Sequence, residues 1–297
     1  MSRRGATAVA GLAFVVGALA LARSESSSGG TRQPLSWAFA IGNGQLKGSA
    51  EEVGARLGEF DLVVVDGQEA KPAELDALRS RGVTTLGYLS VGTIEKWRPW
   101  YRKVKRFRLN VWQDWRDEWF ADVSKRKLRR FWTQRVGPKT LRKGFDGLFL
   151  DNVDMVDTRN HRHQRKGMRK LVRKLSRLSH DRDALLFAQN GHGILDRLGL
   201  VSLLDGWNRE DATWTFDFDR RRYVRQRKAE IARGQDELAD FASRGLIVTT
   251  TDYTKAGDDE AEAEAIANAC EAGALPYVSN IGLTAKRLPD PPLTCQP

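Results

Sequence analysis

Two acidic residues that follow apolar segments have the type and setting needed to cleave a glycosidic bond. Asp151 directly follows the apolar run GLFL, and Glu210 follows the segment LLDGWNR. A carboxylate at the end of a buried segment is costly in free energy unless it is paired or functional. Glycoside hydrolysis needs two such groups facing a pocket, one to attack the anomeric carbon or activate water and one to protonate the leaving oxygen. We therefore expect Asp151 and Glu210 to be catalytic; the alternative for Glu210 is an ion pair with Arg209 or with Arg220–Arg222.

Polar residues also follow the other apolar runs, and together they predict a rim that binds sugar. Carboxylate, amide and phenol groups match sugar hydroxyls, and tryptophan and tyrosine rings can stack on the apolar faces of a sugar. The residues that we expect to contact the substrate are Asp66, Tyr88, Ser90, Asn152, Asp154, Gln189, Asn190, Asn208 and Tyr253. Tryptophans near the same run ends either stack on sugars or pack in the ordinary way: Trp97, Trp100, Trp112, Trp115, Trp119, Trp207 and Trp214.

Other chemistries find little support in the sequence. The four histidines show no metal-ligand spacing, and two of them, His161 and His163, lie in a very basic stretch that is hostile to a cation. Asp151 and Asp154 together are an alternative site for a divalent ion. No Gly-x-Ser-x-Gly elbow is present, which argues against a serine nucleophile. We therefore expect neither a metal nor a cofactor.

Eight apolar runs, separated by helix-like segments, predict the frame that positions these residues. They are Ser36–Ile41, Leu62–Asp66, Thr84–Ser90, Gly147–Asp151, Leu185–Asn190, Leu203–Asn208, Leu246–Thr251 and Ala274–Ser279. They lack strict alternation, as strands buried on both faces do. Helical patterns cover Ala73–Arg81, Gln164–Leu178, Arg225–Ser243 and Asp258–Ala272. This repetition predicts an α/β fold, a single-domain (β/α)8 TIM barrel with its chemistry at the carboxyl ends of the strands. The alternative is an open doubly wound sheet, but no glycine-rich phosphate loop follows the first run.

The two ends of the chain suggest export. Residues 1–23 combine a basic start with an apolar run, which predicts a secretory signal peptide or an N-terminal anchor. A flexible linker is expected at 24–34 and the barrel domain at 35–297, so we expect a secreted or cell-surface protein. In an exported protein the only two cysteines, Cys270 and Cys295, are expected to form a disulfide; the alternative is two unpaired thiols.

The charge of the chain is strongly positive and unevenly distributed. The net charge is +11, and about 27 of the 49 Lys and Arg residues lie between Lys96 and Arg182. Such a field could attract an anionic polymer, an acidic cell surface or a nucleic acid, or it could simply be the solvated exterior of a barrel. Base-reading motifs are missing and the export signal argues against nucleic acid. We therefore expect a monomer with a polysaccharide partner and no nucleic acid, and membrane contact only if the N-terminal segment is uncleaved.

Four segments, in order along the chain, give it a resemblance to a known family. They are GYLSVG at 87–92, DGLFLDNVD at 146–154, QNG at 189–191 and DGWNRE at 205–210. With these segments the chain resembles glycoside hydrolase family 114, the endo-α-1,4-polygalactosaminidases, which are exported (β/α)8 barrels. The resemblance extends over about 35–284. It implies an O-glycosyl hydrolase acting on an α-linked amino-sugar polysaccharide by a retaining mechanism, with Asp151 as nucleophile and Glu210 as acid/base.

Two features depart from that family pattern. Thr93 stands after Gly92, where the family usually has an acid, and Glu95 follows two residues later. The family substrate is cationic, whereas this chain is basic, so an acetylated or anionic α-linked glycan is an alternative substrate. Two non-enzymatic hypotheses remain beside hydrolysis: a cell-surface barrel that binds glycan without cleaving it, and an anchored protein whose basic face holds acidic polymers.

Overall fold

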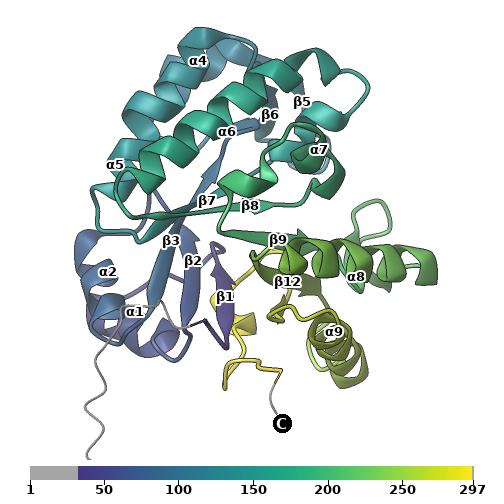
Figure 1. Ribbon diagram of the computed structural model, residues 1–297. Helices are drawn as coiled ribbons and strands as arrows, with labels where there is room; N and C mark the ends of the chain where they lie inside the picture. The colour runs from purple at the N-terminus through teal and green to yellow at the C-terminus, as the bar shows by residue number, and fades with distance from the viewer. Residues whose placement is uncertain (1–32, 296–297) are drawn as a thin grey trace, which may run out of the picture. The chain divides into compact units, whose positions relative to one another are not determined.

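Eight parallel strands form the main sheet of this protein, whose computed structural model describes residues 33–295 (Figure 1). The strands are β1 (Trp37–Ala40), β2 (Leu62–Asp66), β3 (Thr84–Ser90), β7 (Gly147–Asp151), β8 (Leu185–Gln189), β9 (Gly206–Glu210), β12 (Ile247–Tyr253) and β13 (Val278–Ser279). They are hydrogen-bonded in the order β1-β2-β3-β7-β8-β9-β12-β13, and every neighbouring pair is parallel. Because parallel strands point the same way, all their carboxyl ends lie at one mouth of the sheet.

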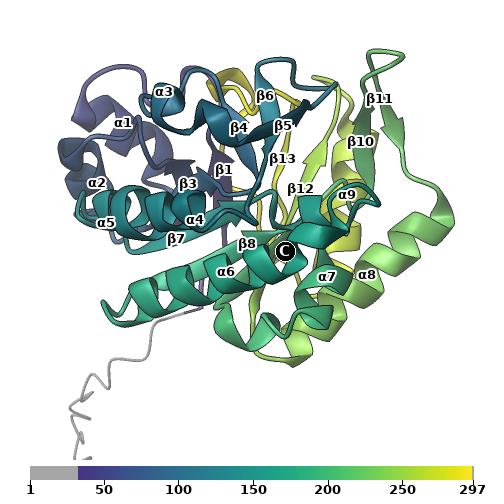
Figure 2. The same cartoon turned by 90° about the horizontal axis from the view of Figure 1, so that it is seen from above.

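Helices follow the strands and cover the outside of the sheet (Figures 1 and 2). The α-helices are α1 (Ala50–Leu57), α2 (Pro72–Arg79), α3 (Tyr101–Val104), α4 (Arg126–Phe131), α5 (Gly137–Leu141), α6 (Arg165–His180), α7 (His192–Arg197), α8 (Lys228–Ser243) and α9 (Asp259–Glu271). Short 3-10 turns lie at Lys105–Phe107, Val153–Asp157, Arg162–Gln164, Val201–Leu203 and Ala285–Arg287, and one π-helical turn at Trp132–Val136 joins α4 to α5. The alternation of strand and helix is that of a TIM barrel, as the sequence predicts.

Side chains close the seam between the first and last strands. Among residues 33–295 no hydrogen-bonded ladder joins β13 to β1. Instead the indole nitrogen of Trp37 donates to the carbonyl of Leu275 at 2.9 Å, and its ring lies 5.7 Å from that of Tyr277. Trp37 and Tyr277 are almost completely buried, so their apolar area seals the seam without backbone pairing.

Strand alternation divides the core into an inner and an outer layer. In β7, Phe149 packs inside the barrel against Phe39 at 5.2 Å between ring centres, whereas Leu148 and Leu150 belong to the outer layer beneath α6. Successive side chains of a strand point to opposite faces, so Asp151 has the same inward direction as Phe149. Asp151 is also the last residue of β7, so its side chain points into the mouth of the barrel.

Two small sheets are inserted at the mouth. Strands β4 (Thr93–Glu95), β5 (Arg108–Val111) and β6 (Glu118–Ala121) form an antiparallel sheet in the order β4-β6-β5 after β3. After β9, strands β10 (Trp214–Asp217) and β11 (Arg222–Arg225) form a hairpin. In Figure 2 both insertions lie along the same edge of the molecule, and a contact between the rings of Trp115 and Phe218, 5.6 Å apart, joins them.

Most predicted elements agree with the structure, and three differ. The last predicted run, Ala274–Ser279, is a strand only at Val278–Ser279, and Leu275 makes an isolated parallel bridge with Thr249. The run predicted at Leu203–Asn208 is shifted, because Val201–Leu203 forms a 3-10 turn and β9 begins only at Gly206. The helix predicted from Arg225 begins at Lys228, because Arg225 pairs with Trp214 in the hairpin. The predicted signal peptide or anchor at 1–23 and most of the predicted linker at 24–34 lie outside the described residues.

Two further sequence expectations concern the C-terminal segment and the membrane. Cys270 at the end of α9 and Cys295 form a disulfide with a Cα–Cα distance of 5.3 Å. The bond fastens the tail to the last helix. No helix within residues 33–295 is both long and apolar enough to cross a membrane.

Candidate active site

The two acids singled out by the sequence lie on strands separated by one other strand, β8. Asp151 ends β7 and Glu210 ends β9. In β9, Trp207 and Arg209 point outward, where Trp207 joins the outer core layer and Arg209 pairs with Glu237 of α8. Glu210 has the opposite direction, into the mouth. The two carboxylates thus face each other across the end of β8.

Gln189, which ends β8, joins the two carboxylates with a single amide nitrogen. Its Nε2 donates to Oε2 of Glu210 at 2.6 Å and to Oδ1 of Asp151 at 3.2 Å. These two oxygens therefore lie no more than about 6 Å apart, within the range that the carboxyl pairs of glycosidases span. Asn208 holds the bridge in place because its Nδ2 donates to the side-chain oxygen Oε1 of Gln189 at 3.1 Å.

Asp151 accepts four hydrogen bonds. The Tyr88 hydroxyl donates to Oδ2 at 2.6 Å, and the amide of Gln189 reaches Oδ1 as described. Asn152 donates twice, from its backbone to Oδ1 at 2.6 Å and from its side chain to Oδ2 at 3.0 Å. This double contact depends on a left-handed backbone at Asn152, with φ 60°. Four donors on one carboxyl favour its ionised form.

Glu210 is held by residues from two strand ends, those of β8 and β12. Asn190 donates from Nδ2 to Oε2 at 2.9 Å and accepts from the Glu210 backbone at 3.0 Å, and the Tyr253 hydroxyl donates to Oε1. Asn190 and Asp211, which follow the ends of β8 and β9, share the left-handed conformation of Asn152. Three successive strands thus end in the same backbone turn, which an Asn or Asp adopts more readily than other non-glycine residues.

The two buried carboxyls have different pKa values. Burial raises the pKa of Asp151 to about 6, while the hydrogen bond from Tyr88 lowers it. Burial raises the pKa of Glu210 further, to about 8, and the nearby charges of Asp151 and Asp211 add to this increase. Around neutral pH the pair therefore favours an ionised Asp151 and a protonated Glu210, the division of labour that a nucleophile and an acid require.

A cavity of about 710 Å³ surrounds the pair, a size typical of a ligand site. Its lining is strongly acidic, in contrast with the basic chain as a whole. Nine carboxylates line it: Asp66, Glu69, Glu95, Asp114, Glu118, Asp151, Asp154, Glu210 and Asp211. Arg98 is the one lysine, arginine or histidine residue among the residues that line this cavity.

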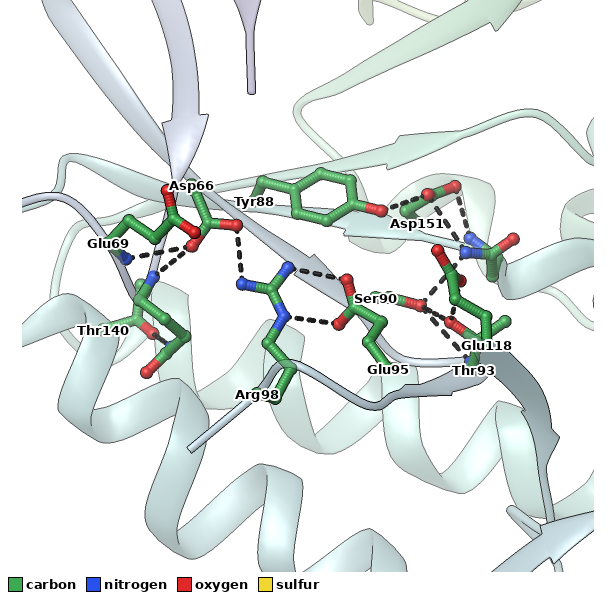
Figure 3. Close-up of polar contacts among 12 residues, drawn as sticks. Asp66, Glu69, Tyr88, Ser90, Thr93, Glu95, Arg98, Glu118, Thr140 and Asp151 are labelled. Atoms are coloured by element: carbon green, nitrogen blue, oxygen red, sulfur yellow. Dashed lines mark hydrogen bonds and ion pairs between the residues drawn. The ribbon is translucent and has the colours of Figure 1, made fainter. Parts of the chain in front are cut away.

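Arg98 is occupied by two of those acids, as Figure 3 shows. Its guanidinium donates to both oxygens of Glu95, at 2.6 and 2.7 Å, and to Oδ2 of Asp66 at 2.6 Å. All three side chains are nearly inaccessible to solvent. The other oxygen of Asp66 accepts from the backbone of Gln68 and Glu69. Asp66, predicted to bind substrate, lines the cavity but is the partner of a buried cation. Sequence analysis missed Arg98, because nothing in the sequence pairs residues 32 positions apart.

Glu118 is a second residue that the sequence did not reveal. It begins β6 of the inserted sheet, and its Oε2 accepts from the Thr93 hydroxyl at 3.0 Å. Thr93 contacts the Ser90 hydroxyl at 2.5 Å, and Ser90 accepts from Asn152 at 3.0 Å (Figure 3). Burial, and then the charge of Glu95, raises the pKa of Glu118 to about 8. Hydrogen bonds thus connect the Glu118 carboxyl to Asn152, the residue that donates twice to Asp151.

The remaining predicted residues divide into two groups. Tyr88, Asn152, Asp154, Asn190, Gln189 and Tyr253 all line the cavity. Ser90 and Asn208 do not: both are fully buried, and they hold Asn152 and Gln189 from behind. Asp154 lies in the 3-10 turn after β7, next to Gly191. A Cβ added to Gly191 would lie only 2.6 Å from the Cβ of Asp154.

The tryptophans divide in the same way. Trp97, Trp112 and Trp115 line the cavity, and Trp97 is 52% exposed and Trp115 39% exposed. Trp100 and Trp207 are buried in the core. The other two lie in the insertions: Trp119 stands in β6, and Trp214 donates to Glu264 of α9 at 3.0 Å. Exposed indoles on a cavity wall suit sugar faces, because their apolar area is not used in folding.

The described residues offer no cluster of metal ligands. Within 33–295, no group of three or more His, Cys, Asp or Glu residues is arranged to hold an ion. None of the four histidines is among the residues that line the cavity. Two of them have carboxylate partners at the barrel exterior: His180 contacts Asp205 at 3.0 Å and His192 contacts Asp240 at 2.8 Å.

Comparisons with known proteins show the family and the fold. The model of glycoside-hydrolase family GH114 matches residues 19–289. An uncharacterised protein of Thermotoga maritima is 22% identical over 235 residues, which cover 72% of this chain and 71% of that protein. The glycoside hydrolase domain of PelA from Pseudomonas aeruginosa has the same fold, with a TM-score of 0.71 and 23% identity over 84% of this chain and 96% of that domain. Ega3 of Aspergillus fumigatus, solved with galactosamine, has a TM-score of 0.64 and 18% identity over 84% and 93% of the two chains. Because the family match spans most of the sequence, this protein belongs to glycoside-hydrolase family GH114 and is a glycoside hydrolase.

Proposed function

We propose that the enzyme hydrolyses an α-linked amino-sugar polysaccharide with retention of configuration. Glu210 protonates the glycosidic oxygen while Asp151 attacks the anomeric carbon, so the C–O bond breaks and a glycosyl ester of Asp151 forms. Glu210, now ionised, removes a proton from water, and the resulting hydroxide attacks the same carbon and releases Asp151. The observation that carries this proposal is the Gln189 amide that bridges both carboxylates.

The surrounding hydrogen bonds suit each step. Tyr88, Asn152 and Gln189 supply four donors that stabilise the Asp151 carboxylate before attack. Glu210 has the higher pKa and so retains its proton at neutral pH. After the first step Asp151 is an uncharged ester. This removes one cause of the raised pKa of Glu210, whose acidity then moves toward that of a base, as the second step requires.

The charge of the cavity favours a cationic sugar. Nine carboxylates line it, and its one positive side chain, Arg98, is already paired with Glu95 and Asp66. An anionic glycan would meet this field unfavourably, whereas the ammonium group of an amino sugar would be attracted. The net charge of +11 opposes approach only at long range, because salt screens charges beyond about 8–10 Å. The galactosamine-bound structure of Ega3 adds weight to the same substrate class.

Glu118 is the carboxylate that we assign to the ammonium group. One of its oxygens accepts from Thr93, and the other has no hydrogen-bond partner within residues 33–295 although the side chain lines the cavity. Family members usually have an acid at the position of Thr93, and here Glu118 brings a carboxylate to the Thr93 hydroxyl from another strand. A bound ammonium would offset the raised pKa of Glu118 and ionise it.

The test is a product assay with the purified protein. Oligomers of α-1,4-linked galactosamine are incubated with wild type, and new reducing ends are counted. We expect cleavage by wild type, loss of more than about a thousandfold in Asp151→Asn, and full activity in Asp196→Asn, which changes an exposed acid of α7 outside the cavity. Binding without new reducing ends would instead favour a non-catalytic glycan-binding barrel, and turnover by Asp151→Asn would contradict the mechanism.

The anomeric configuration of the first product tests retention separately. Proton NMR of the fresh reaction distinguishes an α product, expected for retention, from a β product. A β product would show that water attacks directly and that the two carboxyls act as acid and base only. Cleavage of a neutral or anionic glycan in place of the aminated oligomers would contradict the substrate class but leave the two-carboxylate mechanism standing.

We also propose that the enzyme acts outside the cytoplasm, with a signal or anchor at 1–23, a linker at 24–34 and the catalytic domain from 35 onward. The Cys270–Cys295 disulfide supports this location, because such bonds persist in oxidising compartments. The N-terminal sequence of protein recovered from culture medium tests it. A start near residue 24 agrees with cleavage, and retention in the membrane fraction indicates an anchor.

A further inference from the structure

Helices α4, α5 and α6 carry a layer of positive charge on the outside of the barrel. They lie side by side next to β7 and β8 (Figure 1), and the cavity lining includes no residue from them. Twelve exposed cations make up what is called here the basic layer: Arg126, Lys127, Arg130, Arg135, Lys139, Arg142, Lys166, Arg169, Lys170, Arg173, Lys174 and Arg177. The chemistry proposed at the barrel mouth uses none of them.

The basic layer lacks counterions of its own. The sequence has no Asp or Glu between residues 123 and 145 or between 158 and 180. None of the twelve side chains makes a salt bridge with any carboxylate of residues 33–295, although many other arginines of the described chain do so. Like charges held this close repel one another, and an anionic partner would relieve that repulsion.

The cations of α6 are regularly spaced along one direction. Lys166, Lys170 and Lys174 form one row. A second row, Arg169, Arg173 and Arg177, is offset by three residues from the first. A spacing of four residues corresponds to about 6 Å along a helix axis. These two rows, called here the ladder, suit a linear polymer with one anionic group per sugar unit, because each cation can meet an anion without a bend in the polymer.

The rest of the layer narrows the choice of partner. The apolar side chains of α6, among them Met168, Leu171 and Leu175, are buried against the sheet. The large hydrophobic residues that the described chain exposes are Leu35, Trp97, Val111 and Trp115, and none belongs to the basic layer. The layer therefore has no exposed apolar group to insert into a bilayer and no aromatic side chain to stack on nucleic-acid bases.

We propose that the basic layer binds a linear anionic polysaccharide, one that carries carboxylate or sulfate groups. This site is separate from the acidic cavity and selects the opposite charge. One molecule thereby attaches to a polyanionic glycan through α4–α6 and offers its catalytic mouth to an aminated chain. The binding requires neither the catalytic carboxylates nor the identity of the hydrolysed sugar, so it stands independently of the function proposed above.

The test uses heparin as the probe and a matched pair of triple variants. Lys170→Gln/Arg173→Gln/Lys174→Gln removes three cations of the ladder. The control Lys47→Gln/Lys228→Gln/Lys255→Gln removes three exposed cations elsewhere and has the same net charge. We expect the ladder variant to bind heparin about tenfold more weakly at 150 mM NaCl and to elute at lower salt. Its log–log salt slope should fall by about 2, at roughly 0.7 per lost contact. The control should bind like wild type.

Three outcomes would overturn the proposal. Wild type that fails to bind heparin, or a control that weakens as much as the ladder variant, would reduce the layer to a solvated surface. Tighter binding of oligo-dT or of phosphatidylglycerol vesicles than of heparin, at equal salt and charge, would assign the layer to another class of partner. Weaker heparin binding by the Asp151→Asn variant would show that heparin binds in the cavity. Circular dichroism and thermal melting of all variants check that each one is folded.

Discussion

The hydroxyl of Tyr88 donates a hydrogen bond to Oδ2 of Asp151 at 2.6 Å. Asp151 ends β7, and Tyr88 lies in the neighbouring parallel strand β3, two residues before its end. The Tyr88 ring is fixed by Phe39 and Phe149 in the barrel interior. The phenol therefore reaches the carboxylate from a rigid support. Burial raises the pKa of Asp151, and this hydrogen bond is the largest influence that lowers it. Tyr88 thus sets how much of Asp151 is ionised at a given pH.

Tyr88→Phe should shift the acidic limb of the activity profile upward. Removing the Tyr88 hydroxyl leaves the Asn152 side chain as the one donor to that oxygen, so the pKa of Asp151 rises and the nucleophile ionises only at higher pH. We expect kcat/KM at pH 6 to fall by about 10- to 100-fold, with a smaller loss at pH 8. Tyr101→Phe, which removes a hydroxyl paired with Arg108 outside the cavity, should leave the profile unchanged. An unshifted limb in Tyr88→Phe would separate Tyr88 from the ionisation of Asp151.

The wild-type profile should be bell-shaped, with limbs near pH 6 and pH 8. Activity requires Asp151 without its proton and Glu210 with it, so it rises through the lower apparent pKa and falls through the higher. Glu210→Gln should lose about 10²- to 10⁴-fold on polymer and lose the alkaline limb. On an aryl glycoside, whose leaving group needs no acid, the first step should survive in Glu210→Gln but not in Asp151→Asn. The reverse pattern would exchange the two roles.

Much of this arrangement can be predicted from sequence where one strand determines it. The runs Leu62–Asp66, Thr84–Ser90 and Gly147–Asp151 match strands to the residue, because each contains an apolar stretch that ends in a polar residue. Alternation along a strand then places its last side chain at the barrel mouth. Asp151 and Glu210 could therefore be selected without knowledge of their partners.

Features that depend on contacts between distant segments could not be predicted in this way. Glu118 lies on a strand of four residues, EWFA, whose pattern does not differ from that of a loop. Its approach to Thr93 follows from antiparallel pairing of β4 with β6. Ser90 and Asn208 end up behind the cavity because Asn152 and Gln189 stand in front of them, and a list of strand ends cannot distinguish the two layers.

Glu118→Gln should reduce activity selectively on a substrate with free amines. The amide keeps the shape and an acceptor for Thr93 but loses the charge that meets an ammonium group. We expect kcat/KM to fall about 10- to 100-fold on aminated oligomers and less than about threefold on the same oligomers after N-acetylation. Thr93→Glu in the Glu118→Gln background returns a carboxylate to the same place and should restore part of the activity. Equal losses on both substrates would show that Glu118 has no role in amine recognition.

Asp252→Asn should weaken the dependence of stability on pH. Oδ1 of Asp252 accepts from the backbone of Thr213 and Trp214, whereas its buried Oδ2 has no partner within the described residues. Burial raises the pKa of Asp252 to about 7, above its usual value near 4 in an unfolded chain. The folded state therefore holds the proton more tightly, and the stability that this provides decreases as pH rises from about 4 to about 7. Thermal melting at pH 5 and pH 8 should differ less in the variant. A larger difference would mean that Asp252 is ionised when folded.

Trp97 and Trp115 should matter for long substrates and not for short ones. Both indoles are exposed on the wall of the cavity, and the contact of Trp115 with Phe218 connects the two inserted sheets across it. A ring that stacks on a sugar contributes on the order of 1 kcal/mol, so each Trp→Ala change should raise KM about fivefold for long oligomers. For a substrate that occupies only the subsites next to Asp151 and Glu210, KM should not change. Leu35→Ala removes an exposed apolar side chain outside the cavity and serves as the control. If KM rises equally for substrates of all lengths, the indoles support the catalytic pair itself and do not form distant subsites.

Internal cleavage of long chains, seen as early mid-sized products, should persist in every variant that keeps both acids.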